Sequence, residues 1–140
     1  MNRSIQLLLV DDMEDEALLL VAELERQGFN IAWRRVETAV DLEAALQEQD
    51  WDMVFCDYVM PNFSGPRAVQ LIKQRHPDLP VIMVSGRVEE ELSVEVMRNG
   101  AADSVQKHHR ARLGPAVARE LEEAAMRRER RSAREALSRL

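Results

Sequence analysis

Charged and hydroxyl side chains stand directly after several short apolar runs of this 140-residue sequence. They are the carboxylates of Asp11, Asp12 and Asp57, the hydroxyl of Ser85 and the amine of Lys107. Carboxylates that lie close together repel each other, and a divalent cation relieves that repulsion. Mg²⁺ prefers oxygen ligands and keeps several waters. Two carboxylates, a backbone carbonyl and an incoming phosphoryl oxygen are therefore a suitable ligand set for it. Since Lys and Ser can hold phosphoryl oxygens, the set fits phosphoryl transfer to a carboxylate.

These side chains can meet only if the apolar runs before them are neighbouring strands of one sheet. The expected strands are residues 5–10, 31–37, 53–56, 81–84 and 102–106. Most of them are nearly continuous apolar runs, which is typical of parallel strands covered on both faces. The run 31–37 is more polar, so we expect it nearer the sheet edge. Because the carboxyl ends of parallel strands open into one crevice, Asp11, Asp12, Asp57, Ser85 and Lys107 should converge there.

Helical patterns separate the expected strands. The predicted helices cover residues 14–27, 38–49, 64–76 and 89–98, and a further helix follows residue 112. Thr38 and Ser64 are placed to cap two of them, and Gly28 is placed to end the first. The alternation of strands and helices predicts an α/β fold, a doubly wound five-stranded parallel sheet with helices on both faces and right-handed crossovers.

Composition and charge exclude several classes of protein. No apolar run approaches the ~18 residues of a membrane span, so we expect a soluble domain that does not enter a membrane. The single cysteine, Cys56, fits a reducing compartment, and the first residues do not resemble a secretory signal, so a cytoplasmic location is expected. Residues 1–112 carry 12 Lys and Arg against 20 Asp and Glu, which argues against direct binding of nucleic acid.

The order of the motifs resembles the receiver domain of two-component response regulators. Asp11-Asp12 after the first strand, Asp57 followed by Met60-Pro61 and Gly65, Ser85 and Lys107 carry the resemblance, which covers residues 5 to about 125. It implies a flavodoxin-like sheet with strand order 2-1-3-4-5. It also implies that Asp57 is the phosphoacceptor, which takes a phosphoryl group from the phosphohistidine of a histidine kinase or phosphotransfer protein.

The same resemblance implies roles for the other site residues. Asp12, Asp57 and the backbone carbonyl of Val59 would ligate Mg²⁺, and Asp11 would act mainly through a water. Ser85 and Lys107 would hold the phosphoryl oxygens. An enzyme, an aspartyl phosphatase on a similar sheet, is disfavoured because such enzymes have a second Asp two residues after the nucleophile, where this chain has Val59.

Two positions depart from the family pattern and leave an alternative open. Ser104 stands where receivers usually have an aromatic residue, and His108 stands where they usually have Pro after the active-site Lys. A cis peptide before His108 would cost ~3–4 kcal/mol, so a trans path is expected there. The alternative function is a receiver-like protein-interaction module that signals without phosphorylation.

The C-terminal residues change their apolar pattern near residue 125. Up to that point, apolar residues at helical spacing predict packing on the sheet; they are Leu113, Val117, Leu121 and Ala124. Met126, Ala133, Leu137 and Leu140 share a different face, which the same sheet cannot cover. The division is therefore a receiver domain at 1–125 and a helical extension at 126–140, for which the simplest partner is the same helix in a homodimer.

Two kinds of side chain near these motifs are interpreted as structural. Cys56 precedes Asp57 within an apolar run, so a buried, inert thiol is expected. Trp33 and Trp51 are expected to pack at the ends of elements.

Overall fold

A parallel sheet forms the centre of the computed structural model, which describes residues 4–58, 60–61, 63–85, 100–101, 103–106 and 110–140. The strands are β1 (Ile5–Val10), β2 (Ile31–Val36), β3 (Met53–Asp57), β4 (Val81–Ser85) and β5 (Asp103–Gln106). All neighbouring strands pair in parallel, in the order β2-β1-β3-β4-β5. The predicted parallel α/β sheet is therefore confirmed, with β2 at one edge.

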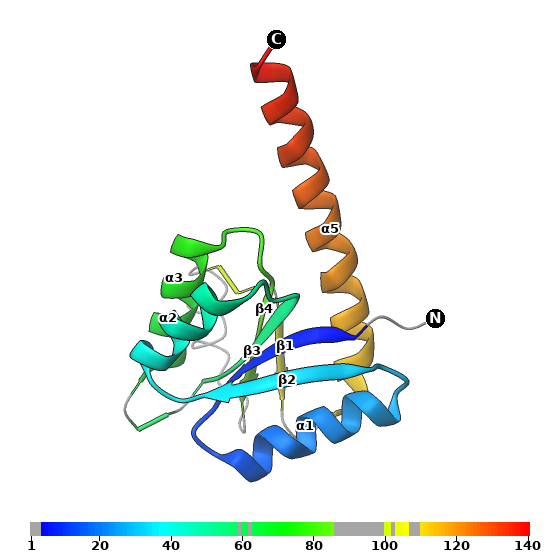
Figure 1. Ribbon diagram of the computed structural model, residues 1–140. Helices are drawn as coiled ribbons and strands as arrows, with labels where there is room; N and C mark the ends of the chain where they lie inside the picture. Colours follow the sequence, from blue (N-terminus) through cyan, green and yellow to red (C-terminus); the bar gives the residue numbers. More distant parts are fainter. Residues whose placement is uncertain (1–3, 59, 62, 86–99, 102, 107–109) are drawn as a thin grey trace.

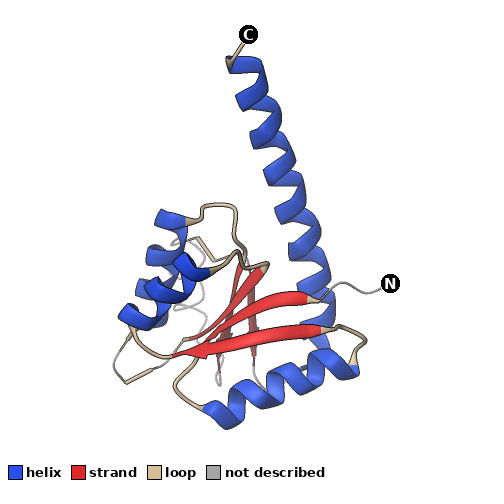
Figure 2. Cartoon of the chain, in the orientation of Figure 1, coloured by secondary structure: helices blue, strands red, loops and turns tan. Residues whose placement is uncertain are grey.

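Helices cover both faces of this sheet (Figures 1 and 2). They are α1 (Glu14–Arg26), α2 (Ala39–Glu48), α3 (Gly65–Arg75) and α5 (Leu113–Ser138), with a short 3-10 helix, η1 (Arg110–Arg112), before α5. The helix expected at 89–98 lies outside the described residues. Alternate residues of each strand point to opposite faces. Leu8 and Val10 accordingly join a core beneath α2 and α3, while Leu7 and Leu9 join a core beneath α1 and α5.

The helix ends follow the predicted capping residues. Thr38 Oγ1 accepts a hydrogen bond from the Asp41 N–H at 3.1 Å, and Ser64 Oγ accepts one from the Arg67 N–H at 3.3 Å. Gly28 ends α1 with a φ of 101°, which favours glycine. These caps fix where α2 and α3 begin relative to the strands before them.

Helix α5 consists of a packed first half and a projecting second half (Figure 1). Leu113, Val117 and Ala124 are buried and Leu121 packs against the core, as the sequence predicts. Beyond residue 125 the helix leaves the sheet, and Met126 and Leu137 are 45% and 68% exposed. The change of apolar face therefore coincides with the point where the helix extends beyond the sheet.

The two tryptophans differ. Trp51 is buried, and its Nε1–H donates to the Ala45 carbonyl at 2.8 Å, so its predicted packing role is confirmed. Trp33 lies in the middle of β2 and is 37% exposed, so the expectation that it packs at an element end is wrong. Its strand has a sheet neighbour only on the β1 side, which leaves the ring partly in solvent.

Among the described helices, none has a stretch both long and apolar enough to span a membrane.

Candidate functional site

Three carboxylates meet at the carboxyl edge of the sheet. One carboxylate oxygen from each of Asp11, Asp12 and Asp57 lies within 4.8 Å of the others. Asp11 and Asp57 are only 3% and 6% exposed, whereas Asp12 is partly exposed. The sequence predicts this convergence, and the geometry confirms it for these three residues.

Backbone pairing brings Asp11 and Asp57 side by side. In the β1–β3 ladder Val10 pairs with Cys56, so the next residue of each strand carries a carboxylate at the same level. On the other side of β1, the Asp11 N–H continues the β1–β2 ladder by donating to the Val36 carbonyl at 3.0 Å. Asp11 Oδ1 accepts a hydrogen bond from the Met13 N–H at 2.9 Å. Asp11 is thus held by both its backbone and its side chain at the turn into α1.

The chain after Asp57 is held against β4 and α3. The Tyr58 N–H donates to the Val84 carbonyl at 3.1 Å, and the Gly65 N–H donates to the Tyr58 carbonyl at 3.3 Å. A side chain at Gly65 would collide, because its Cβ would lie 2.8 Å from the Asp57 carbonyl oxygen and 2.9 Å from Tyr58 Cα. Gly65 is therefore required for the close approach of α3 to the strand end that carries Asp57.

The surroundings of Cys56 show the low polarity and negative charge of this strand end. Burial, and then the charges of Asp57 and Asp11, raise the pKa of the thiol far above its ordinary value. The thiol therefore stays protonated, and its Sγ lies 3.6 Å from the Asp57 carbonyl oxygen. This confirms the expectation of a buried thiol and disfavours redox chemistry beside Asp57.

The donor set of the cluster fits a hard divalent cation. All three side chains offer oxygen, two of them are buried, and their negative charges face one another. Mg²⁺ is commonly bound by one or two carboxylates with waters completing its shell, and the partly exposed Asp12 leaves access for them. Val59, whose carbonyl the family resemblance implies as a further ligand, lies outside the described residues.

The remaining predicted site residues belong to β4 and to the end of β5. Ser85 is the last residue of β4, one residue beyond Val84, which pairs with Asp57 in the ladder. Ser85 in turn pairs with Gln106, the last residue of β5. Lys107 directly follows Gln106 and lies outside the described residues. The topology thus brings the backbone of Ser85 and the residue before Lys107 to the edge that holds the carboxylates.

Arg35 is a neighbour of the cluster that the sequence analysis does not identify. Its guanidinium donates to the Asp11 carbonyl at 3.1 Å and also bonds Glu37 at 3.1 Å. The only available signal is its place near the end of β2, the strand beside β1. Arg35 therefore braces the turn that begins at Asp11.

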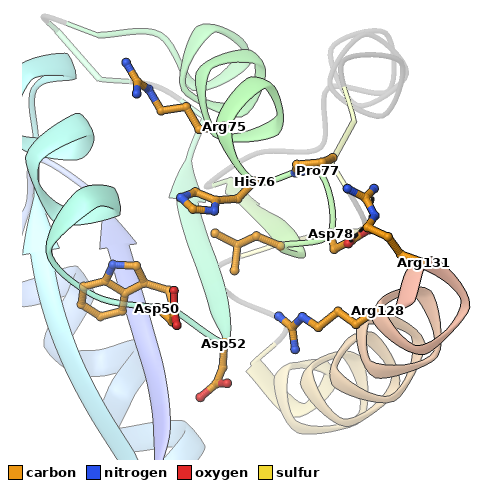
Figure 3. A pocket seen from close by; sticks show the side chains of 10 residues that line it. Asp50, Asp52, Arg75, His76, Pro77, Asp78, Arg128 and Arg131 are labelled. Atoms are coloured by element: carbon orange, nitrogen blue, oxygen red, sulfur yellow. Dashed lines mark hydrogen bonds and ion pairs between the residues drawn. The ribbon is translucent and has the colours of Figure 1, made fainter. Parts of the chain in front are cut away.

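A separate groove lies at the opposite edge of the sheet, between the α3–β4 connection and α5 (Figure 3). Its lining includes Trp51 and Leu79, acidic residues from 50–52, and Arg128 and Arg131 of α5. Of the predicted site residues that the structure describes, none lines it. The carboxylate cluster and this groove are therefore distinct features at the two ends of the strands.

Comparison with known proteins assigns the family. Residues 7–118 match the profile of the response regulator receiver domain. The nitrogen assimilation regulatory protein NtrX of Azorhizobium caulinodans is 33% identical over 129 residues, which make up 88% of this chain and 27% of that protein. The DNA-binding transcriptional regulator NtrC of Salmonella typhimurium is 32% identical over 98 residues, 70% of this chain and 20% of that protein.

A solved structure of similar size agrees with this assignment. The crystal structure of the receiver domain of NtrX from Brucella abortus has a TM-score of 0.74 and 32% identity, and the match covers 83% of this chain and 98% of that one. By contrast, the chain spans about a quarter of the length of the curated relatives it matches. The carboxylate cluster, the parallel sheet and these matches together show that the chain belongs to the response regulator receiver domain family.

Proposed function

We propose that this chain is a phosphoacceptor that takes a phosphoryl group on Asp57 from a histidine kinase or phosphotransfer protein, with Mg²⁺ as cofactor. The observation that carries the proposal is the convergence of Asp11, Asp12 and Asp57 within 4.8 Å at the carboxyl edge of a receiver sheet. Such a cluster of like charges is costly to hold together, and a bound cation with an incoming phosphoryl group would offset that cost.

The transfer step uses Asp57 as the nucleophile. A carboxylate oxygen of Asp57 attacks phosphorus and forms a new P–O bond, while the P–N bond of the phosphohistidine breaks. The electron pair of that bond stays on the imidazole nitrogen, which takes up a proton, and Asp57 becomes an acyl phosphate. When bound, Mg²⁺ would neutralise charge on the phosphoryl oxygens. Asp57 and Asp12 would hold it, together with the carbonyl of Val59.

The other residues of the site assist without taking part in bond making. Asp11, whose Oδ1 already accepts from the Met13 N–H, would contact the cation mainly through a water. The hydroxyl of Ser85 and the ammonium of Lys107 would hold oxygens of the transferred group; Ser85 pairs with Gln106, the residue before Lys107 in the sequence, at the carboxyl end of the strands. Loss of Lys107 would then weaken the response to phosphorylation more than the displacement itself.

A phosphorylation-independent interaction module is the second candidate function. Ser104 and His108 favour it, because they replace the aromatic residue and the proline that receivers usually use in switching. Ser104 lies within β5, paired with Met83, and His108 lies outside the described residues. The two candidates differ in one observable, the modification of Asp57 in the presence of Mg²⁺.

A mass measurement on the intact protein separates the two candidates. Acetyl phosphate with Mg²⁺ should add one acid-labile phosphoryl group to the wild type and none to Asp57→Asn. Asp50→Asn is the matched control, because Asp50 is an exposed aspartate at the other end of the strands. If the wild type gains no phosphoryl group and binds no beryllofluoride at any Mg²⁺ concentration, the interaction module is the better account.

The projecting half of α5 is proposed to join two copies of the chain and to pass the state of Asp57 to an output. Its apolar residues Met126 and Leu137, and Leu140 just after the helix, are exposed in the monomer. A parallel pairing of the same helix would cover them. Light scattering at tens of micromolar should show a dimer for residues 1–140 and a monomer for residues 1–125. Two monomers would remove the dimer from the proposal.

A further inference from the structure

Arg35, near the end of β2, binds the turn that carries Asp11 and Asp12. Its Nη1 donates to the Asp11 carbonyl at 3.1 Å and to Glu37 Oε2 at 3.1 Å. Asp11 lies one residue beyond the last paired residue of β1. Arg35 therefore extends the attachment of β1 to β2 into the turn before α1.

The orientation of the Asp12 carboxylate depends on its backbone. Among the described residues, none forms a hydrogen bond or an ion pair with this carboxylate. The peptide groups on its two sides are held, however. The Asp11 carbonyl, which belongs to the first of them, accepts from Arg35, and the Met13 N–H, which belongs to the second, donates to Asp11 Oδ1 at 2.9 Å. These two contacts therefore fix the backbone that carries the Asp12 side chain.

The positive charge of Arg35 is paired with a carboxylate. Nη1 lies 3.1 Å from Glu37 Oε2, and only 27% of the Arg35 side chain is exposed. A cation without a partner beside the carboxylate cluster would repel a divalent metal ion, and the carboxylate of Glu37 offsets that repulsion. Arg35 therefore acts on the cluster mainly as a hydrogen-bond donor to its backbone.

We infer that Arg35 is a positioning residue for the Mg²⁺ site: by holding the peptide group between Asp11 and Asp12, it orients the Asp12 carboxylate towards that of Asp57. Carboxylate oxygens of the three aspartates lie within 4.8 Å of one another. Mg²⁺ demands near-octahedral geometry with oxygens at about 2.0–2.1 Å, so a ligand that turns away with its backbone lowers the affinity. The inference rests on the proposed function, which supplies the cation.

The binding test compares Arg35→Met with Arg34→Met. Methionine keeps an unbranched stem but has no donor, so packing is retained while the hydrogen bond is lost. Arg34 is the matched control, because it is the adjacent residue of β2, points to the opposite face of the sheet and pairs with Glu48. Its replacement removes the same charge from the same strand.

The measurement is the rise of the unfolding temperature with the concentration of Mg²⁺ as the only added ligand. Arg35→Met should lower the affinity for Mg²⁺ about tenfold, the smaller of the losses typical when a residue that orients a metal ligand is removed. Arg34→Met should change the affinity less than about twofold.

The direction of the change separates positioning from two other roles for Arg35. If its charge acted by repelling the metal ion, its removal would raise the affinity for Mg²⁺. If it served only the stability of β2, its removal would lower the unfolding temperature in chelator and leave the affinity unchanged. Arg35→Lys keeps a donor on a long stem, so it should restore the affinity to within about twofold of the wild type. Arg35→Val, with a strand-forming side chain, replaces Arg35→Met in these tests if the latter folds poorly.

A second readout follows the backbone of Asp12 in the metal-free protein, by ¹⁵N relaxation. In Arg35→Met the order parameter of the Asp12 N–H should fall from about 0.85, the value of a rigid backbone, towards the value of about 0.6 below which a segment is flexible. Arg34→Met should leave this order parameter unchanged. The readout depends on neither Mg²⁺ nor phosphorylation.

The outcomes separate this inference from the proposed function. An affinity for Mg²⁺ in Arg35→Met that equals or exceeds that of the wild type overturns the positioning role, as does an equal loss in Arg34→Met or an unchanged Asp12 order parameter. A wild type whose unfolding temperature does not respond to Mg²⁺ overturns both the inference and the Mg²⁺ site of the proposed function. If the wild type binds Mg²⁺ and Arg35→Met binds it about tenfold more weakly, but acetyl phosphate never modifies Asp57, the proposed function fails and the role of Arg35 stands.

Discussion

Charges are arranged in opposite ways at the two ends of the parallel strands, which we call the carboxyl edge and the amino edge of the sheet. At the carboxyl edge, the like charges of Asp11, Asp12 and Asp57 face one another within 4.8 Å. At the amino edge, Asp78 is matched by Arg131, whose Nε lies 3.1 Å from one carboxylate oxygen and whose other nitrogen donates to the second at 3.2 Å (Figure 3). Paired charges hold a helix in place, whereas gathered like charges weaken the fold until a ligand binds them.

The amino edge shows what pairing achieves. The backbone carbonyl of Asp78 also accepts a hydrogen bond from Arg127 at 3.3 Å. Two arginines of α5 therefore bind one residue of the α3–β4 connection. Nearby, Arg119 of α5 bonds Asp103 at the start of β5 at 2.5 Å. The two contacts with Asp78 involve residues just beyond 125, where α5 leaves the sheet, so they set the direction of its projecting half. The difference between the edges separates a structural use of charge from a functional one.

The largest expected effect is on Mg²⁺ binding at the carboxyl edge. Asp12→Asn should lower the affinity for Mg²⁺ at least roughly tenfold, because a neutral amide replaces one of the carboxylates. The measurement is the rise of the unfolding temperature with Mg²⁺ concentration. Asp50→Asn, at the other edge, should keep the wild-type affinity. Equal affinity in Asp12→Asn would mean that the cluster does not bind the cation.

Removing the charge of Asp57 should raise the stability of the metal-free protein. Asp57→Asn removes a buried charge from beside Asp11, so the free energy of unfolding should rise by about 1 kcal/mol in the presence of a chelator. Urea denaturation of the two proteins tests this. A loss of stability would contradict the view that repulsion between these carboxylates weakens the metal-free fold.

At the amino edge, replacing an aspartate by asparagine should lower the stability of the fold instead of raising it. Asp78→Asn breaks the paired contact with Arg131, so the free energy of unfolding should fall by about 0.5–1 kcal/mol. Trypsin should also cut after Arg127 and Arg131 a few-fold faster, since α5 opens locally more often. Glu43→Gln, which breaks the exposed pair with Arg75 elsewhere, is the control and should not change cleavage in α5. Unchanged cleavage in Asp78→Asn would show that Asp78 does not hold the helix.

Glu120 offers the smallest and most specific test, through its dependence on pH. This residue of α5 is 2% exposed, and burial, followed by the charge of Glu123, raises the pKa of its carboxyl above the ordinary 4.5. The folded state therefore disfavours the ionised form, so ionisation reduces stability at pH 7 and has no effect well below pH 4.5. Glu120→Gln should stabilise the protein by less than about 1 kcal/mol at pH 7. Urea denaturation at pH 7 and at pH 4 should show that this gain is largely lost at the lower pH. A gain that does not depend on pH would assign the effect to packing.

The sequence predicts the carboxyl edge better than the contacts that hold α5. Apolar runs that end in Asp11 or Asp57 identify both the strands and the place where their side chains meet, because parallel strands share one carboxyl edge. Thr38 and Ser64 are equally predictable, since a capping residue acts within one turn of its own helix.

The contacts that hold α5 depend on single polar side chains far apart in the chain. Gln27 Oε1 accepts a hydrogen bond from the N–H of Gly114, 87 residues away, and Asp78 and Arg131 are 53 apart. Neither pair repeats at helix or strand spacing, so periodicity gives no signal for it. The change of apolar face predicts that α5 leaves the sheet, but not that Arg131 then meets Asp78.

The most direct test of the functional account is to map the modified residue with and without Mg²⁺. After incubation with acetyl phosphate, borohydride reduction converts an aspartyl phosphate to homoserine, which peptide mass spectrometry locates. We expect the conversion at Asp57 alone, in the presence of Mg²⁺ and not with a chelator. Conversion at Asp11 or Asp12, or equal conversion at Asp57 with the chelator, would contradict a Mg²⁺-dependent phosphoacceptor at the carboxyl edge of this sheet.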